Sequence, residues 1–179
     1  MKPLLTANKL PKAPKALVNP KTEALKFLLE NELRGLYWLD TTWVSLTPYV
    51  NQHTTLPQLQ QALQTNLHEA EEQLNLIAII YTKLGKSITG KKNTALQGLI
   101  RQTESLLKKS ATETISDVLI LLAHQKIIGY KLAAYNTLYL IAKRLRYLEI
   151  AMLLKRSALQ NSRALKRNDQ LLKPVVNFD

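Results

Sequence analysis

Residues 28–44 read LLENELRGLYWLDTTWV, and this stretch decides the fold. Apolar side chains recur along it at a spacing close to 3.6 residues: Leu29, Leu33, Leu36, Trp43 and Val44. Such spacing predicts a long helix with one apolar face. Asp40 falls on that face. A carboxylate that faces a core must be paired, hydrogen-bonded, neutralised or bound to a metal, because burying it alone is costly. Asp40 is therefore a candidate functional residue.

Glu69 interrupts the apolar face of the next predicted helix in the same way. The helical spacing around it gives Ala62, Asn66, Gln73, Leu76 and Ile80. The two later long helices offer no carboxylate on their apolar faces. Asp40 and Glu69 therefore have the pattern of half a metal site, and the missing half bears directly on function.

The amino-acid composition favours one fold class and excludes functions that depend on cysteine. The chain has 179 residues with five glycines and no cysteine, which favours one all-helical domain and excludes disulfides, thiolate metal sites and thiol catalysis. No secretory signal pattern is recognised at the start of the sequence. No stretch approaches about 20 uninterrupted apolar residues, so no membrane partner is expected. We predict a cytoplasmic location.

Hydrophobic spacing and turn residues predict four long helices and one short helix. Their expected ranges are 22–48, 57–84, 94–107, 117–145 and 148–172. Two hairpins joined by a connection that holds the short helix describe an antiparallel four-helix bundle with a crossover. The predicted divisions are a basic arm rich in proline and lysine over 1–21, extended or disordered, the bundle over 22–172, and a tail over 173–179.

Several short motifs, in this order and spacing, resemble the YciE/YciF-type ferritin-like family. They are ELRGLY at 32–37, LQQAL at 59–63, LGK at 84–86, ALQGLI at 95–100, QK at 125–126, AYNTL at 134–138 and AMLL at 151–154. The resemblance covers roughly residues 23–172. It implies a rubrerythrin-like bundle, usually dimeric and associated with bacterial stress responses.

The resemblance also implies where a di-metal site would lie. The family's first two glutamates fall on Asp40 and Glu69, with Gln73 one turn later. The other two long helices depart from the family pattern at positions that are polar, acidic or metal-ligating there: Ile128, Gly129, Lys131, Leu159, Gln160, Asn161 and Leu165. The site is therefore expected to be degenerate.

Two carboxylates supply too little charge and too few donors for two divalent cations. We therefore expect no metal cofactor, with iron or manganese as the alternative. In that alternative, His124 joins Asp40 and Glu69 as a ligand; otherwise it is a satisfied core or surface histidine. The metal-free interpretation predicts that Lys131, or an amide such as Gln73 or Gln125, lies within hydrogen-bond reach of one of the acids.

The net charge is +12, and most of it lies at the two ends of the chain. The candidate contact residues are Lys2, Lys9, Lys12, Lys15, Lys21, Arg156, Arg163 and Arg167. They can contact the phosphate backbone of a nucleic acid or a neighbouring subunit. Alternatively, they are solvated and contact no partner. We expect the arm to become ordered by assembly with another subunit more often than by nucleic acid.

Three functions follow from these observations. The first is a non-catalytic ferritin-like protein with a structural or interaction role, assembled as a homodimer or larger oligomer. The second is a metal-dependent oxidase or peroxide-handling protein with a reduced ligand set. The third is a stress protein that associates with DNA through its basic ends.

Overall fold

The computed structural model describes residues 19–110 and 112–176, and over these residues the ordered elements are all helices. They are α1 (Pro20–Asn51), α2 (Pro57–Lys83), α3 (Thr94–Leu107), α4 (Glu113–Arg144) and α5 (Leu148–Val176). This confirms the predicted all-α fold. In the described part of the chain, no helix is both long and apolar enough to cross a membrane.

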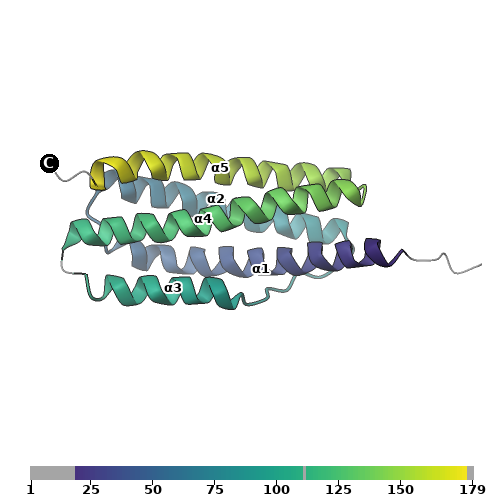
Figure 1. Ribbon diagram of the computed structural model, residues 1–179, viewed down its shortest axis with the longest axis horizontal. Helices are drawn as coiled ribbons and strands as arrows, with labels where there is room; N and C mark the ends of the chain where they lie inside the picture. Colours follow the sequence, from purple (N-terminus) through teal and green to yellow (C-terminus); the bar gives the residue numbers. More distant parts are fainter. Residues whose placement is uncertain (1–18, 111, 177–179) are drawn as a thin grey trace, which may run out of the picture.

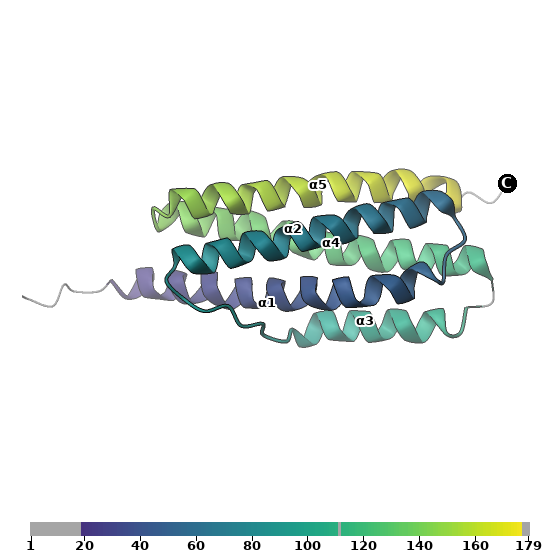
Figure 2. The same cartoon turned by 180° about the vertical axis from the view of Figure 1, so that it is seen from behind.

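The four long helices form two antiparallel hairpins, α1 with α2 and α4 with α5 (Figure 1). Each long helix packs against two others, so that α1 and α5 lie at opposite corners of the bundle. The chain leaves α2, runs back beside α1, forms α3 and then enters α4 (Figure 2). This crossover makes α2 and α4 parallel and confirms the ferritin-like connection that contains a short helix.

Three helices are longer than the sequence predicted, and side chains cap the first turns of two of them. α1 begins at Pro20 rather than at residue 22: the Asn19 side chain accepts a hydrogen bond of 3.0 Å from the Lys21 amide. α4 begins four residues early, where Thr112 caps its first turn. α5 continues through residues of the predicted tail to Val176. The rest of the predicted arm, residues 1–18, lies outside the described residues.

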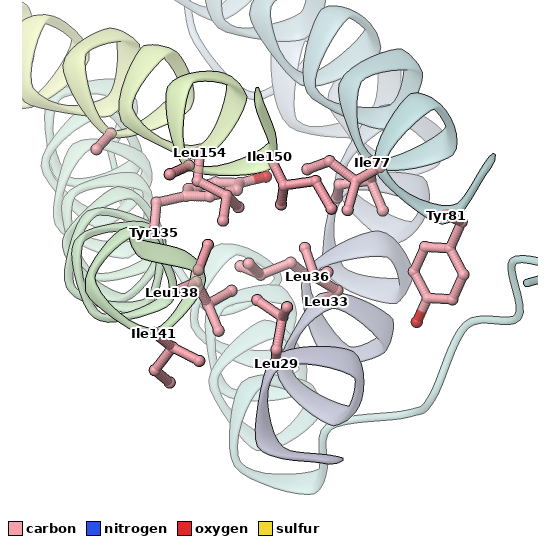
Figure 3. Packing of buried hydrophobic residues seen from close by; sticks show 14 residues of the cluster. Leu29, Leu33, Leu36, Ile77, Tyr81, Tyr135, Leu138, Ile141, Ile150 and Leu154 are labelled. Atoms are coloured by element: carbon pink, nitrogen blue, oxygen red, sulfur yellow. The ribbon is translucent and has the colours of Figure 1, made fainter. Parts of the chain in front are cut away.

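Two apolar clusters fill the two ends of the bundle and are separated by a region of polar side chains. The first joins the first half of α1 and the second half of α2 to the α4–α5 turn, and Figure 3 shows its side chains pointing inward from these helices. Its largest fully buried members include Leu29, Leu33, Leu36, Ile77, Tyr135 and Leu138. The second cluster lies toward the other end, where α3 covers α1 and α4. Polar side chains occupy the middle.

Candidate functional site

A layer of buried polar side chains crosses the bundle between the two apolar clusters. Its buried members come from all four long helices: Asp40, Asn66, Gln73, His124, Lys131, Ser157, Asn161 and Asn168. Polar groups in such a place destabilise the fold unless they are hydrogen-bonded or paired. Their partners therefore decide what the layer can do.

Asp40 is fully buried on α1 and forms an ion pair with Lys131 of α4, whose ammonium group donates to Asp40 Oδ1. This confirms that the amine lies within hydrogen-bond reach of the acid. Burial raises the pKa of the Asp40 carboxyl, and the charge of Lys131 opposes the rise. Asp40 Oδ2 is also buried and has no hydrogen-bond partner among the described residues.

Glu69 of α2 is partly buried and pairs with Arg167 of α5. The Arg167 Nη2 atom donates to Glu69 Oε2 at 2.6 Å and to Asn66 Oδ1 at 2.7 Å. Asn66 lies almost one turn before Glu69, so the guanidinium group bridges two side chains of the same helix face. Each of the two candidate ligand acids therefore already has a cation as its partner.

His124 is a core histidine with its own partners. Its Nδ1 atom lies 3.3 Å from Asn66 Nδ2, and its ring stacks on Trp43, with centroids 4.9 Å apart and planes 11° apart. Burial, together with the nearby charges of Lys131 and Arg167, lowers the pKa of His124 to about 3. The imidazole is therefore neutral near pH 7, with Nδ1 accepting from the Asn66 amide.

The predicted amide partners behave differently from Lys131. Gln73 is buried and accepts a hydrogen bond of 3.3 Å from Asn161 Nδ2. Asn161 Nδ2 also donates to the Ser157 carbonyl at 2.8 Å. Gln125 donates to Asp169 instead, at 2.6 Å, so of the alternative partners that were predicted it is Lys131 that bonds to one of the two acids.

A small cavity lies beside these groups, and its wall includes Glu69, His124, Lys131 and the apolar Ile128. The space open to the centre of a water-sized molecule is about 10 Å³, close to the minimum for a single water. Such a space suits one bridging water. It is too small for an organic substrate.

The predicted basic contact residues divide into two groups where the structure describes them. Lys21 and Arg163 are exposed, and Arg156 is exposed with its Nη2 atom 3.8 Å from Glu72. Arg167 is turned inward to Glu69, so its guanidinium group is committed within the chain. Lys2, Lys9, Lys12 and Lys15 lie outside the described residues.

The role of Arg167 was missed from the sequence. The signal lay in α5, where Asn161, Ala164 and Asn168 follow one another at core spacing and are all buried. Arg167 directly precedes Asn168 and therefore flanks the buried stripe on the side of α2. A long basic side chain at such a flank can reach inward while its stem stays near the surface.

Comparison with known proteins places this architecture in a family. Residues 24–178 match the family described as "Domain of unknown function (DUF892)". The chain belongs to the DUF892 family. The Escherichia coli K12 protein YciF is 29% identical over 103 residues, an alignment that spans 57% of this chain and 62% of YciF.

Two solved structures share the DUF892 chain's fold. The E. coli stress protein YciF superposes with a TM-score of 0.81 and 22% identity, over 87% of this chain and 98% of that one. YcfI from Rhodopseudomonas palustris, described as a candidate structural protein, gives a TM-score of 0.78 and 23% identity, over 88% and 98% of the two chains. At this identity, the likeness establishes the fold alone.

A di-metal centre of the ferritin-like type does not fit this DUF892 chain. Such a centre takes carboxylates from all four helices together with imidazoles. Within residues 19–110 and 112–176, no group of three or more His, Asp or Glu side chains could hold a metal ion. Asp40 and Glu69 already face ammonium and guanidinium groups. The polar layer is balanced by its own charges.

Proposed function

We propose that this chain is a non-catalytic member of its family, whose bundle has a structural or interaction role and carries no metal. One observation supports the proposal best: both carboxylates at the family's metal positions are paired with cations from the opposite hairpin, Lys131 and Arg167. Two acids and two cations leave no net negative charge to attract a divalent ion. A neutral His124 adds one imidazole as a possible ligand, but its Nδ1 atom already accepts a hydrogen bond from the Asn66 amide.

The cellular setting and the assembly state belong to the same proposal. YciF is described as a stress protein, and YcfI as a candidate structural protein. By analogy, we infer a stress-related scaffold that works as a homo-oligomer.

Elemental analysis tests the metal-free proposal. The full chain is purified without chelators from cells grown with added iron and manganese, and the metal content per chain is measured. The expected result is far below one metal ion per chain, since neither acid is free to act as a ligand. Iron or manganese near a stoichiometric level would overturn the proposal and favour the oxidase alternative.

A matched variant shows whether the conditions could load a site at all. Lys131→Glu removes the ammonium partner of Asp40 and adds a third carboxylate near His124 and Glu69. Metal uptake by this variant but not by the natural chain would show that the growth conditions can load a site, and that having lysine rather than an acid at position 131 keeps the natural chain free of metal.

A further inference from the structure

Five large apolar side chains are exposed on a single face that α4 and α5 share. They are Leu122 (43% exposed), Leu140 (63%), Leu148 (65%), Met152 (73%) and Leu159 (52%). On each helix these residues recur at spacings that return to the same side, and α4 and α5 run side by side as one hairpin (Figure 1). We call this surface the α4–α5 outer face.

Cations surround these apolar side chains. The exposed basic residues on or beside the α4–α5 outer face are Lys126, Lys143, Lys155, Arg163, Lys166 and Lys173. None of them forms an ion pair with another described residue, whereas Arg156 and Arg167, which are turned toward α2, pair with Glu72 and Glu69 of that helix. Asp169 is the one described acid at the seam, and Gln125 donates to it. The face is therefore both apolar and strongly positive.

Two of these cations, Lys143 and Lys155, lie together near the α4–α5 turn. The Nζ atoms of Lys143 and Lys155 lie 5.5 and 5.8 Å from the centre of the Tyr139 ring. Leu140 directly follows Tyr139, and Met152 lies almost one helical turn before Lys155. Tyr139 and the two lysines occupy the seam between the helices, while the apolar side chains stand on the outermost ridges.

The combination of exposed apolar side chains and unpaired cations fits some kinds of binding partner poorly. A second copy that presented the same face would set lysine against lysine, which is unfavourable. A nucleic-acid backbone would match the charge and leave five large apolar side chains unsatisfied. A partner helix docks into an apolar groove, and here the seam holds two lysines.

We propose that the α4–α5 outer face binds the surface of a bilayer that contains anionic lipids. Apolar side chains on the outer ridges can enter the boundary between headgroups and acyl chains, while neighbouring lysines remain at the phosphate level. Charge and apolar burial then act together, as peripheral binding requires. The prediction of no membrane partner rested on the lack of a spanning segment, and surface binding needs none.

Vesicle sedimentation tests the proposal with the full chain. The protein is mixed with vesicles of phosphatidylcholine alone or of phosphatidylcholine with phosphatidylglycerol. The expected result is binding to the anionic vesicles only, weakened by added salt. Lys143→Gln/Lys155→Gln should weaken this binding about thirtyfold. Leu140→Ser/Met152→Ser should weaken it about tenfold at unchanged charge.

Control variants distinguish vesicle binding by this face from binding through the overall positive charge of the protein. Lys92→Gln/Lys108→Gln removes two exposed charges elsewhere, and Ile79→Ser removes an exposed apolar side chain of α2; each should leave binding within about twofold of the natural chain. Thermal unfolding checks that every variant is folded. Equal losses in controls and face variants would overturn the proposal. So would duplex DNA binding that persists in Leu140→Ser/Met152→Ser when no vesicle binding is found.

Discussion

Lys131 places a positive charge beside Asp40 in the middle of the bundle, where the related family pattern has an acid. Both side chains are almost completely buried. Because the pair is desolvated, its net contribution to folding is small, but removing one partner leaves the other without compensation. The pair therefore avoids an uncompensated buried charge at a position where the family pattern would place a metal ligand.

Replacing Lys131 with methionine should lower the free energy of unfolding by about 3 to 5 kcal/mol at neutral pH. Without the ammonium group, nothing opposes the effect of burial, so the pKa of Asp40 rises further. An acid whose folded pKa is raised destabilises the fold as the pH rises above its unfolded value. The loss should therefore shrink as the pH is lowered toward about 4. Urea unfolding at several pH values measures both effects.

The double variant Asp40→Leu/Lys131→Met is the control, since it removes both charges and keeps much of the volume. Its unfolding free energy should lie within about 1.5 kcal/mol of the natural chain. A double variant as unstable as Lys131→Met would show that lost packing, rather than the unpaired acid, causes the destabilisation.

His124 should give the fold a specific pH dependence. Its ordinary pKa of 6.5 falls to about 3 in the folded chain, mainly because the ring is buried and also because Lys131 and Arg167 are near. A depressed folded pKa contributes stability that is complete above pH 6.5 and is lost as the pH falls toward 3. His124→Phe keeps a ring against Trp43 and abolishes this titration.

The natural chain should therefore lose about 2 kcal/mol relative to His124→Phe between pH 7 and pH 5. Chemical unfolding of both proteins across this range supplies the comparison. The lost hydrogen bond from Asn66 lowers the stability of the variant at every pH and does not affect the slope. Parallel pH profiles for the two proteins would contradict the assigned burial of a neutral histidine.

At the scale of elements, polar side chains and one glycine define several of the helix ends. Gly85 follows α2 with φ +66°, a left-handed conformation that most side chains disfavour, and the next amide, that of Lys86, bonds back to the Tyr81 carbonyl at 3.0 Å. Gly85 therefore ends α2. Asn93 caps α3, since its side chain accepts from the Leu96 amide at 3.2 Å.

Asn93 also joins α3 to the bundle, because its Nδ2 atom donates to the Tyr130 hydroxyl of α4 at 3.0 Å. Asn93→Ala should lower the free energy of unfolding by about 1 to 2 kcal/mol through loss of the cap and this bond. Amide hydrogen exchange should become faster in α3 first, since α3 buries only a few side chains.

Tyr130→Phe is the control for the contact with α4, because it removes the hydroxyl and keeps the cap. Its cost should be less than that of Asn93→Ala, and exchange at the first amides of α3 should change little. If the two variants accelerate exchange equally, the bond to Tyr130 matters more than the cap.

At the scale of the whole molecule, the chain separates its charges by position. The polar layer inside the bundle balances two acids with two cations, while the net charge of +12 remains for the surface and the chain ends. A balanced interior supports a scaffold, and an unbalanced exterior supports attraction to anionic partners. These two features underlie the proposed function and the proposed membrane contact.

The sequence was sufficient to predict the bundle, its hairpins and the crossover. Each long helix carries a 3.6-residue apolar pattern, and glycine, proline and polar residues mark the turns, so these properties depend on neighbours along the chain. The same local reasoning located Asp40 and Glu69 on core-facing positions. Lys131 was offered by the family resemblance, which implies an acid at that position, and only as one of several possible partners.

Tertiary structure alone decided the partner of Glu69 and the grouping of exposed side chains. Arg156, Arg163 and Arg167 look alike by spacing, yet Arg167 reaches inward because α2 places Glu69 and Asn66 opposite it. Leu122 and Leu159 are far apart in sequence and share a face only because α4 and α5 pack as neighbours. Helical periodicity fixes which way a side chain points, whereas packing between helices fixes what it meets.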